Sequence, residues 1–346
     1  MNPTISILLS VHNGLPYLEA AVQSILAQTF REFEFLIVDD ASTDGTPDYL
    51  RTLTDPRIRI LSLPQNIGLT AALNAGLREA RGEFVARQDA DDWSHPRRLE
   101  LQLAYLQSHP RCAAVGSQAR LIDGSGRSLG KKDFPLSPHG IRFAHLFDNA
   151  LAHTAVTFRR AEVLSLGGYD ETWTASQDYE LWSRLSATHD LANLPQRLAT
   201  LRILGTSITR QHKRPELIRR VQAAHYERLF GRVPTDADLD LIALFRSRVV
   251  PERLREFRAL LEELIAAYTE KHPAAATDAD FRRSLSMIHE RVGYNLLSLS
   301  RRAGLGELFR AIRTRPAVIF SLPWLRIGAL TVLGDSVRRL YERKQK

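Results

Sequence analysis

The string with the clearest capacity for chemistry is Asp89-Ala90-Asp91-Asp92, which places three carboxylates within four residues. Carboxylates this close repel one another unless a cation or hydrogen-bond donors neutralise them. Hard divalent cations such as Mg²⁺ and Mn²⁺ take carboxylate oxygens and share their coordination shell with substrate phosphates. Asp91, Asp92 and Asp89 are therefore candidate metal ligands. The alternative is that these acids only cap a helix that we expect to begin at Pro96.

A second acidic pair, Asp39-Asp40, opens the string that runs to Thr46. The later part of the string is typical of a turn, because Asp44-Gly45 supplies a bend and Ser42 or Thr46 is able to cap a helix. A carboxylate at the start of this loop is able to accept hydrogen bonds from a nucleobase N–H or a ribose hydroxyl. The pair is thus a candidate nucleoside site, and acids of an ordinary surface turn are the alternative.

Asp178 and His153 are the other candidates for a direct role. Asp178 lies in the first turn of a helix predicted over 177–187, where a carboxylate either complements the helix dipole or, partly desolvated, serves as a general base. The apolar face formed by Leu181, Trp182 and Leu185 would fix that helix to the core. His153 precedes a predicted strand, and the alternative to a role in binding is a histidine satisfied within the core.

The elements around these residues predict a parallel sheet. Short apolar runs alternate with helical patterns, which is typical of βαβ units. The expected strands are 5–10, 33–38, 58–61 and 83–88, and the expected helices are 18–26, 68–80 and 96–109. In open parallel sheets, ligands bind beyond the carboxyl ends of the strands. The loops His12-Asn13-Gly14, Asp39-Asp40 and Asp89–Asp92 should therefore converge at one edge.

The pattern changes after about residue 113. Asp123-Gly-Ser-Gly126 predicts a hairpin turn, strands are expected at 152–159 and 197–204, and from Pro215 onward the pattern is almost entirely helical. We therefore expect an α/β catalytic domain over 1–212 and a helical region over 213–346. The segment 316–334 is mostly apolar and 337–346 is strongly basic, so the tail is either a peripheral contact with an anionic membrane surface or a packed helical cap.

Composition narrows the class of protein. The 346 residues are 44% apolar and 25% charged, which is ordinary for a globular protein. The net charge of +8 is carried mostly by scattered arginines, and no nucleic-acid-binding motif accompanies it, so we expect no nucleic-acid partner. The single cysteine, Cys112, forms no internal disulfide, and no stretch has the length of a signal sequence or a spanning helix. We expect a cytoplasmic location, and a peripheral position at the inner face of the membrane is kept open by the basic tail.

Taken together, these strings resemble glycosyltransferase family 2, whose members have the GT-A fold. The resemblance covers roughly residues 4–210. It is carried by 5–14, 24–30, 35–46, 66–68, 80–85, 89–92, His153, 167–170, Gln177-Asp178 and 202–209. It implies an inverting, metal-dependent transfer of a sugar from a nucleoside diphosphate sugar, a UDP-sugar above all, to an acceptor hydroxyl. The acceptor would be a glycan, a lipid-linked glycan or another hydroxyl compound, as in surface polysaccharide assembly.

The resemblance also assigns residues to roles. It implies that Asp178 is the catalytic base and that a divalent cation, Mn²⁺ or Mg²⁺, binds Asp91 with Asp92 or Asp89. The residues implied to bind the donor are Ser10, His12, Asn13, Asp39, Asp40, Asp89 and His153.

The sequence departs from the family pattern in three places. Gln177 stands where an acid or a small residue usually precedes the base, and the Gln-x-x-Arg-Trp motif of chain-extending members is absent. Arg202-Ile-Leu-Gly205 lacks the histidine that often follows the arginine, and His212 is a candidate to replace it.

Other classes of protein share parts of this pattern. A dinucleotide-dependent oxidoreductase should carry Gly-x-Gly-x-x-Gly after the first strand, and a P-loop enzyme should carry Gly-x-x-x-x-Gly-Lys-Ser/Thr. Neither string is present. The remaining alternative is a sugar-nucleotide-binding scaffold protein without catalytic activity.

Overall fold

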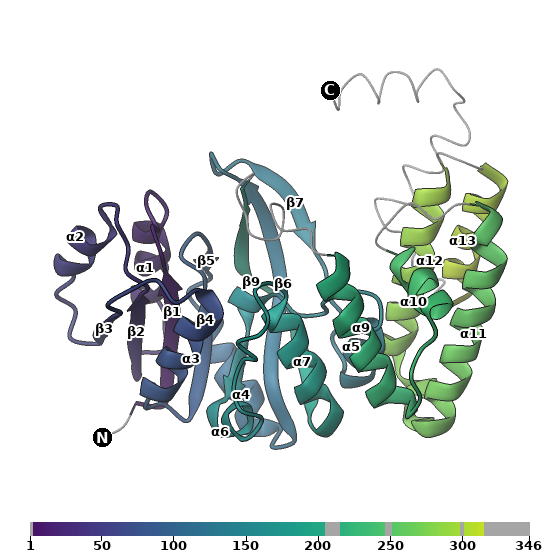
Figure 1. Cartoon of the computed structure of the whole chain (residues 1–346), viewed down its shortest axis with the longest axis horizontal. Coiled ribbons are helices and arrows are strands. Elements are labelled where there is room, and N and C mark those ends of the chain that lie inside the picture. Colours follow the sequence, from purple (N-terminus) through teal and green to yellow (C-terminus); the bar gives the residue numbers. More distant parts are fainter. Residues whose placement is uncertain (1–2, 205–214, 246–250, 298–300, 315–346) are drawn as a thin grey trace. The chain divides into compact units, whose positions relative to one another are not determined.

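The computed structural model describes residues 3–204, 215–245, 251–297 and 301–314 (Figure 1). The chain divides into two compact units, Met1–Leu239 and Asp240–Lys346. The predicted domain boundary near residue 212 lies outside the described residues and stays a prediction, as does a role for His212. The predicted basic tail over 337–346 also lies outside them.

The first half of the sheet is parallel, as the sequence predicts. It contains β1 (Ile5–Val11), β2 (Phe33–Asp39), β3 (Ile58–Ser62) and β4 (Phe84–Gln88) in the order β3-β2-β1-β4. Every pair among these neighbours is parallel. Because β1 lies between β2 and β4, the loops that follow all three strands leave the sheet at the same edge.

The second half of the sheet mixes directions. Next to β4 lies the antiparallel strand β8 (Thr157–Arg159), followed by β6 (Cys112–Asp123), β9 (Asp190–Ile203) and the short β5 (Trp93–Ser94). β6 and β9 are parallel to each other, and β7 (Ser128–Lys132) pairs with β6 as the predicted hairpin. The sheet is thus curled, and β5 returns the chain from the acidic loop to the side of β9.

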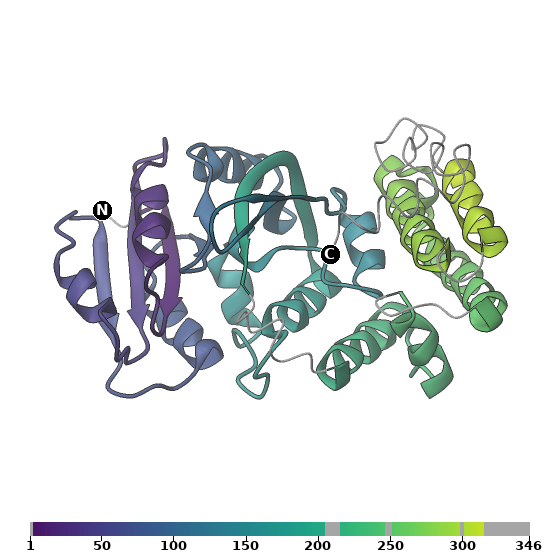
Figure 2. The same cartoon turned by 90° about the horizontal axis from the view of Figure 1, so that it is seen from above.

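Helices cover both faces of this sheet (Figures 1 and 2). The strand residues Ile5, Ile7 and Leu9 pack with α1 (Leu18–Leu26) and α4 (Arg98–Ser108) in one apolar cluster. Leu8, which points to the opposite face, packs in a second cluster that includes residues of α3 (Leu69–Glu79) and α7 (Gln177–Thr188). The alternation along β1 therefore produces a three-layer α/β/α core. The other helices of this unit are α2 (Thr46–Arg51), α5 (Pro138–Ala144), α6 (Arg160–Ser165) and α9 (Pro215–Phe230).

Two expected elements differ from the structure near the site. The first half of the predicted strand 152–159 is instead a 3-10 turn, η1 (His153–Ala155), and only the second half is β8. Here the Thr154 hydroxyl accepts a hydrogen bond from the Asp89 amide, which draws the turn to the acidic loop. The helix expected at Pro96 begins at Arg98, because the Pro96 carbonyl accepts from the Thr29 amide and is not free to begin the helix.

The described part of the second unit is helical, as predicted for this region. Its helices are α11 (Leu254–Lys271), α12 (Ala279–Leu297) and α13 (Arg301–Thr314), and α10 (Asp236–Ala243) spans the division between the units. The 3-10 turns η2 (Pro251–Arg253) and η3 (Pro273–Thr277) flank α11. In the described ranges, no helix combines the length and apolar character that crossing a bilayer requires.

Candidate active site

The loops after β1 and β2 are tied together by side-chain hydrogen bonds. The Asn13 Oδ1 accepts from the backbone amides of Thr43 at 2.8 Å and Asp44 at 3.2 Å. Asn13 adopts a left-handed conformation with φ of 57°, which asparagine tolerates better than most residues. The His12 Nδ1 lies 2.8 Å from the backbone oxygen of Asp40. The first two predicted loops therefore form one structure at the carboxyl edge of the sheet.

Asp39 and Asp40 are both buried, but they are bound differently. The two Asp40 oxygens accept from the backbone amides of Ile67 at 2.8 Å and Gly68 at 2.9 Å, which fixes the loop before α3. Asp39 Oδ1 accepts from the Ser42 amide at 3.1 Å, and no described residue donates to its other oxygen. Asp39 thus keeps more free acceptor capacity than Asp40. Ser10, at the end of β1, is buried beside this edge.

The acidic loop rests on a buried arginine. Arg87 has no exposed surface, and its guanidinium donates to Asp89 Oδ1 at 2.6 Å and to the Leu8 carbonyl at 3.2 Å. Asp92 is also buried, and its Oδ1 accepts from the Arg202 amide at 2.7 Å. Asp89 and Asp92 are therefore held in place by the protein itself. Asp91 is partly exposed, and no other described side chain donates to its carboxylate.

The carboxylates of this loop repel one another and are partly removed from water, which disfavours their ionised forms. Burial, followed by the charge of Asp89, raises the pKa of Asp91 to about 6. Burial and the charges of Asp89 and Asp91 raise the pKa of Asp92 well above its usual range. A nearby cation would relieve this repulsion.

The donor set of the acidic loop also fits a divalent cation. In the described part of the chain, no group of three or more His, Cys, Asp and Glu residues is arranged to hold a metal by protein ligands alone. Mg²⁺, however, is typically bound by one or two carboxylates together with substrate phosphates. The partly exposed Asp91 suits such a shared site.

Arg202 holds the acidic loop in place through hydrogen bonds. Its Nε donates to the Asp91 carbonyl at 3.1 Å, and its Nη1 donates to the carbonyls of Asp123 and Gly124 at 3.1 and 3.2 Å. The guanidinium also lies 4.3 Å from the centre of the Tyr17 ring, a cation–π contact. This arginine therefore joins the acidic loop to the β6–β7 hairpin and to the start of α1.

Asp178 lies in the same electrostatic environment, at the start of α7. The side chain is partly exposed, and its Oδ2 accepts from Asn149 Nδ2 at 2.7 Å. Burial raises the pKa of Asp178 and the charge of Asp89 raises it further, whereas the hydrogen bonds from the Tyr179 amide and Asn149 lower it. The charge of Asp89 reaches Asp178, so the structure brings these two predicted residues into one site.

His153 begins η1 and lies within electrostatic reach of Asp89. Its Nε2 lies 2.9 Å from the Tyr169 hydroxyl, and its ring contacts Trp182 of α7 edge-on. Burial, followed by the charge of Arg87, lowers the pKa of His153 to about 3, so the ring is neutral. The hydrogen bond to Tyr169 is the kind expected of a histidine satisfied within the fold.

The sequence did not identify three residues that organise this site. Asn149 binds Asp178, Arg87 binds Asp89, and Thr154 binds the Asp89 amide. Arg87 had a detectable signal, because a charged residue inside the apolar run 84–88 is unusual unless it has a buried partner. Asn149 and Thr154 had none, since only the tertiary fold brings them to the acids.

The sequence comparisons identify the family. Residues 6–160 match the profile described as Glycosyl transferase family 2. The amylovoran biosynthesis glycosyltransferase AmsE of Erwinia amylovora is 33% identical over 202 residues, which are 57% of this chain and 75% of that protein. The O-antigen biosynthesis glycosyltransferase WbnJ of Escherichia coli is 32% identical over 185 residues, 52% of this chain and 71% of that protein.

The fold comparison agrees with the sequence comparisons. The crystal structure of Staphylococcus aureus TarS residues 1–349 in complex with UDP-GlcNAc has a TM-score of 0.57 with this chain at 17% identity. The match covers 89% of this chain and 90% of that one, which establishes likeness of fold. With the profile match and the coverage of its relatives, the chain belongs to glycosyltransferase family 2.

Proposed function

We propose that the chain is an inverting, metal-dependent glycosyltransferase that moves a sugar from a nucleoside diphosphate sugar to a hydroxyl of a glycan or lipid-linked glycan acceptor. The observation that carries the proposal is the environment of Asp178. This carboxylate is desolvated but still partly exposed, and it lies within the electrostatic reach of the acidic loop. A general base requires such a carboxylate close to the substrate. Residues 1–212 would form the catalytic domain.

The donor would bind at the carboxyl edge of the sheet. Asp39, with an oxygen that no described residue occupies, is suited to accept a hydrogen bond from the nucleoside, and His12 and Asn13 line the same edge. Asp40 would act mainly by fixing the loop 66–68. The fold neighbour TarS was solved with UDP-GlcNAc, which makes a UDP-sugar the first donor to test. The relatives named for amylovoran and O-antigen biosynthesis favour polysaccharide assembly.

A divalent cation, Mn²⁺ or Mg²⁺, would be held by Asp91, with Asp89 or Asp92 assisting. When bound, it would supply positive charge that stabilises the departing nucleoside diphosphate. Asp89 is held by Arg87 and Asp92 by the Arg202 amide, so these contacts would orient the loop for the donor.

Asp178 would accept the proton of the acceptor hydroxyl as its oxygen forms a bond to C1 of the sugar. The bond between C1 and the diphosphate oxygen breaks at the same time, and the electron pair leaves with the nucleoside diphosphate. One displacement inverts the anomeric centre, so no second carboxylate is needed as a nucleophile. Asn149 would hold Asp178 in its ionised form between turnovers, because its amide donates to the carboxylate.

An Asp178→Asn variant tests the proposed base. We expect its turnover to fall by about two to four orders of magnitude, the usual contribution of a general base. Its dissociation constant for the nucleotide should stay within about twofold, because Asp178 contacts neither nucleoside loop. Asp48→Asn on the exposed surface of α2 is the matched control and should leave both values unchanged.

The assay follows sugar release and transfer from a panel of nucleoside diphosphate sugars with Mn²⁺. Turnover of the Asp178 variant near the wild-type rate would remove this residue from the role of base. Nucleotide binding without any release or transfer by the wild type, across donors and acceptors, would favour the alternative of an inactive sugar-nucleotide-binding scaffold protein.

A further inference from the structure

A second polar cavity lies on a different face of α7 from Asp178. Its volume is about 450 Å³, and it is lined by residues of the loop after α6, of α7 and of α9. Glu180 and Arg184 of α7 line it, and Glu180 lies two positions beyond Asp178 in the helix. Because successive helical residues turn by about 100°, Glu180 projects away from the direction of Asp178. The cavity is therefore distinct from the candidate active site.

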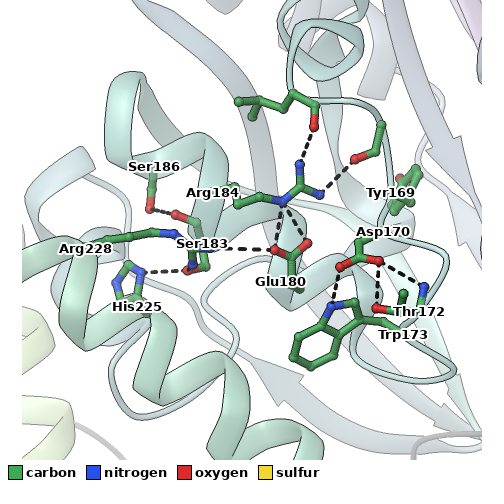
Figure 3. Close-up of polar contacts among 12 residues, drawn as sticks. Tyr169, Asp170, Thr172, Trp173, Glu180, Ser183, Arg184, Ser186, His225 and Arg228 are labelled. Carbon is green, nitrogen blue, oxygen red and sulfur yellow. Dashed lines mark hydrogen bonds and ion pairs between the residues drawn. The ribbon is translucent and has the colours of Figure 1, made fainter. Parts of the chain in front are cut away.

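The acids that line this cavity are already satisfied by the protein. Glu180 is buried, and both of its oxygens accept from Arg184 Nε, at 2.7 and 2.9 Å (Figure 3). Asp170 accepts from the Thr172 amide and hydroxyl through one oxygen and from the Trp173 indole through the other. Neither carboxylate therefore has an oxygen without a hydrogen bond to offer to a ligand cation.

Hydrogen bonds fix the turn after α6, which lines the cavity. Besides Glu180, Arg184 donates to the carbonyls of Leu166 and Gly168, both at 2.8 Å, which fixes the turn after α6 (Figure 3). Gly167 and Gly168 in this turn have φ values of +83° and +76°, which favour glycine. A Cβ atom at Gly167 would meet no heavy atom within 4 Å apart from its chain neighbours, so the space beside this residue is open.

Two arginines of α9 remain able to bind a ligand. Arg220 lines the cavity, has no ion pair among the described residues, and has its guanidinium 4.4 Å from the centre of the Trp173 ring. Arg228 donates to the Ser183 hydroxyl at 2.8 Å and lies 3.8 Å from Glu180, which Arg184 already binds (Figure 3). With Arg184, three arginines line the cavity together with the two acids, and the charge of Glu227 also acts on Arg228.

The spacing of these arginines suits one anionic group. Arg220, Ala224 and Arg228 follow one another at intervals of four residues, so they share a face of α9. Ala224 is small and lies midway between the two arginines along the helix, so its side chain leaves room for a ligand between them. Guanidinium groups bind the oxygens of phosphate in a bidentate manner. We propose that this cavity is a phosphate-binding site, which takes either a phosphoryl group carried by a lipid or free inorganic phosphate.

Phosphate binding is tested directly on the full chain, without donor, with EDTA present to exclude metal-mediated binding at the acidic loop. The melting temperature is measured against inorganic phosphate, with chloride at matched ionic strength as the reference, because a ligand of the native state raises stability by mass action. We expect a saturable rise with phosphate. No rise beyond that of chloride would overturn the proposal.

Two variants and a control locate the phosphate. Arg220→Ala removes a charge, and Ala224→Leu fills the space between the arginines while it keeps both charges. Each should weaken phosphate binding at least tenfold. Arg78→Ala, an exposed arginine on α3 of the same unit, should leave it unchanged. Equal losses for Arg220→Ala and Arg78→Ala, or full binding by Ala224→Leu, would overturn the proposal.

A final comparison distinguishes the source of the phosphate. A prenyl monophosphate in neutral detergent micelles is compared with inorganic phosphate at the same concentration. Binding at least tenfold tighter for the prenyl compound, lost in Arg220→Ala, identifies a lipid-borne phosphoryl group. Equal affinity identifies free phosphate as the ligand. The readout is binding, so the result does not depend on whether Asp178 is the base.

Discussion

Two buried acidic centres, one in each compact unit, behave in opposite ways. In the first unit, the pKa values of Asp91 and Asp92 are raised by burial and by neighbouring carboxylates. In the second unit, Glu307 of α13 has no exposed surface, yet its pKa is lowered. Burial disfavours the charge in both cases, so the difference comes from the partners that each carboxylate has.

Glu307 contacts Arg258 of α11, His289 of α12 and Arg310 of its own helix. One oxygen lies 2.8 Å from His289 Nδ1, and the other accepts from Arg258 Nε and lies 3.6 Å from Arg310. These hydrogen bonds and charges outweigh the cost of burial. The protein itself therefore satisfies the charge and the hydrogen-bonding capacity of this carboxylate.

Among the described residues, Asp89 is the one carboxylate of the acidic loop that forms an ion pair. Arg87 binds Asp89, whereas Asp92 receives hydrogen bonds from the Arg202 amide and the Thr154 hydroxyl, and Asp91 receives no side-chain donor from any other described residue. A buried acid with its own ion pairs is a structural feature, whereas carboxylates that lack an ion pair, such as Asp91 and Asp92, suit a ligand that brings positive charge. The comparison thus separates a functional cluster of carboxylates from a structural one.

The largest effect that would test this contrast is on activity. We expect Asp91→Asn to lower sugar transfer at least a hundredfold at saturating Mn²⁺, because the loop loses its proposed cation ligand. Its stability without metal should not fall, since the change removes repulsion between carboxylates. Activity assays and urea unfolding of the same samples measure both. A marked loss of stability would mean that Asp91 is a structural acid like Glu307.

The corresponding change in the second unit should have the opposite outcome. Glu307→Gln is expected to lower the free energy of unfolding by about 2 kcal/mol, because the buried carboxylate loses its charge-assisted hydrogen bond with Arg258. Urea unfolding measures this loss. Glu262→Gln, in an exposed pair with Arg310, is the matched control and should cost less than about 1 kcal/mol. Equal effects of the two changes would contradict a special role for the buried centre.

Asn149→Ala sharpens the comparison within the active site. The Asn149 amide donates to the ionised Asp178 and lowers its pKa, so its removal should raise that pKa. We expect the acidic limb of the profile of kcat/KM against pH to move upward by about one pH unit, because a hydrogen bond to a charged group contributes about 1.5 kcal/mol. Activity at high pH should change little. An unmoved acidic limb together with a uniform loss of activity would indicate a purely structural role.

The smallest expected effect concerns histidines without a carboxylate partner. Unlike His289, His225 is buried between the Ser183 hydroxyl and the Arg142 carbonyl, and burial lowers its pKa to about 4. The unfolded chain binds a proton near pH 6.5 and the folded chain does not, so stability falls as the pH falls below 6.5. His225 should contribute a loss of about 1 kcal/mol at pH 5.5.

His225→Gln removes this titration and should flatten the decline in stability between pH 6.5 and pH 5.5. Urea unfolding at the two pH values measures the difference. A variant whose stability declines as steeply as that of the wild type would show that His225 does not stay neutral in the fold.

The sequence predicted the elements whose patterns are local. The alternation in 5–10 and 33–38 and the helical spacing in 18–26 correspond to β1, β2 and α1, because each element buries one face with a fixed period. The positions of Asp39, Asp40 and Asp89–Asp92 at strand ends followed from the same patterns. Boundaries were less accurate at 96–109 and 152–159, where contacts with distant residues fix where the element begins.

The sequence by itself determined the family, the βαβ order and the acids that follow the strands, since these depend on residue type and on periodicity along the chain. Only the tertiary structure decided which acids are neutralised. Asn149 and Arg202 reach the carboxylates through packing of distant segments, and burial sets the strength of each charge, including that of Arg87 beside Asp89. Electrostatic energy depends on distance and on exclusion of water, and neither quantity is written in the local sequence.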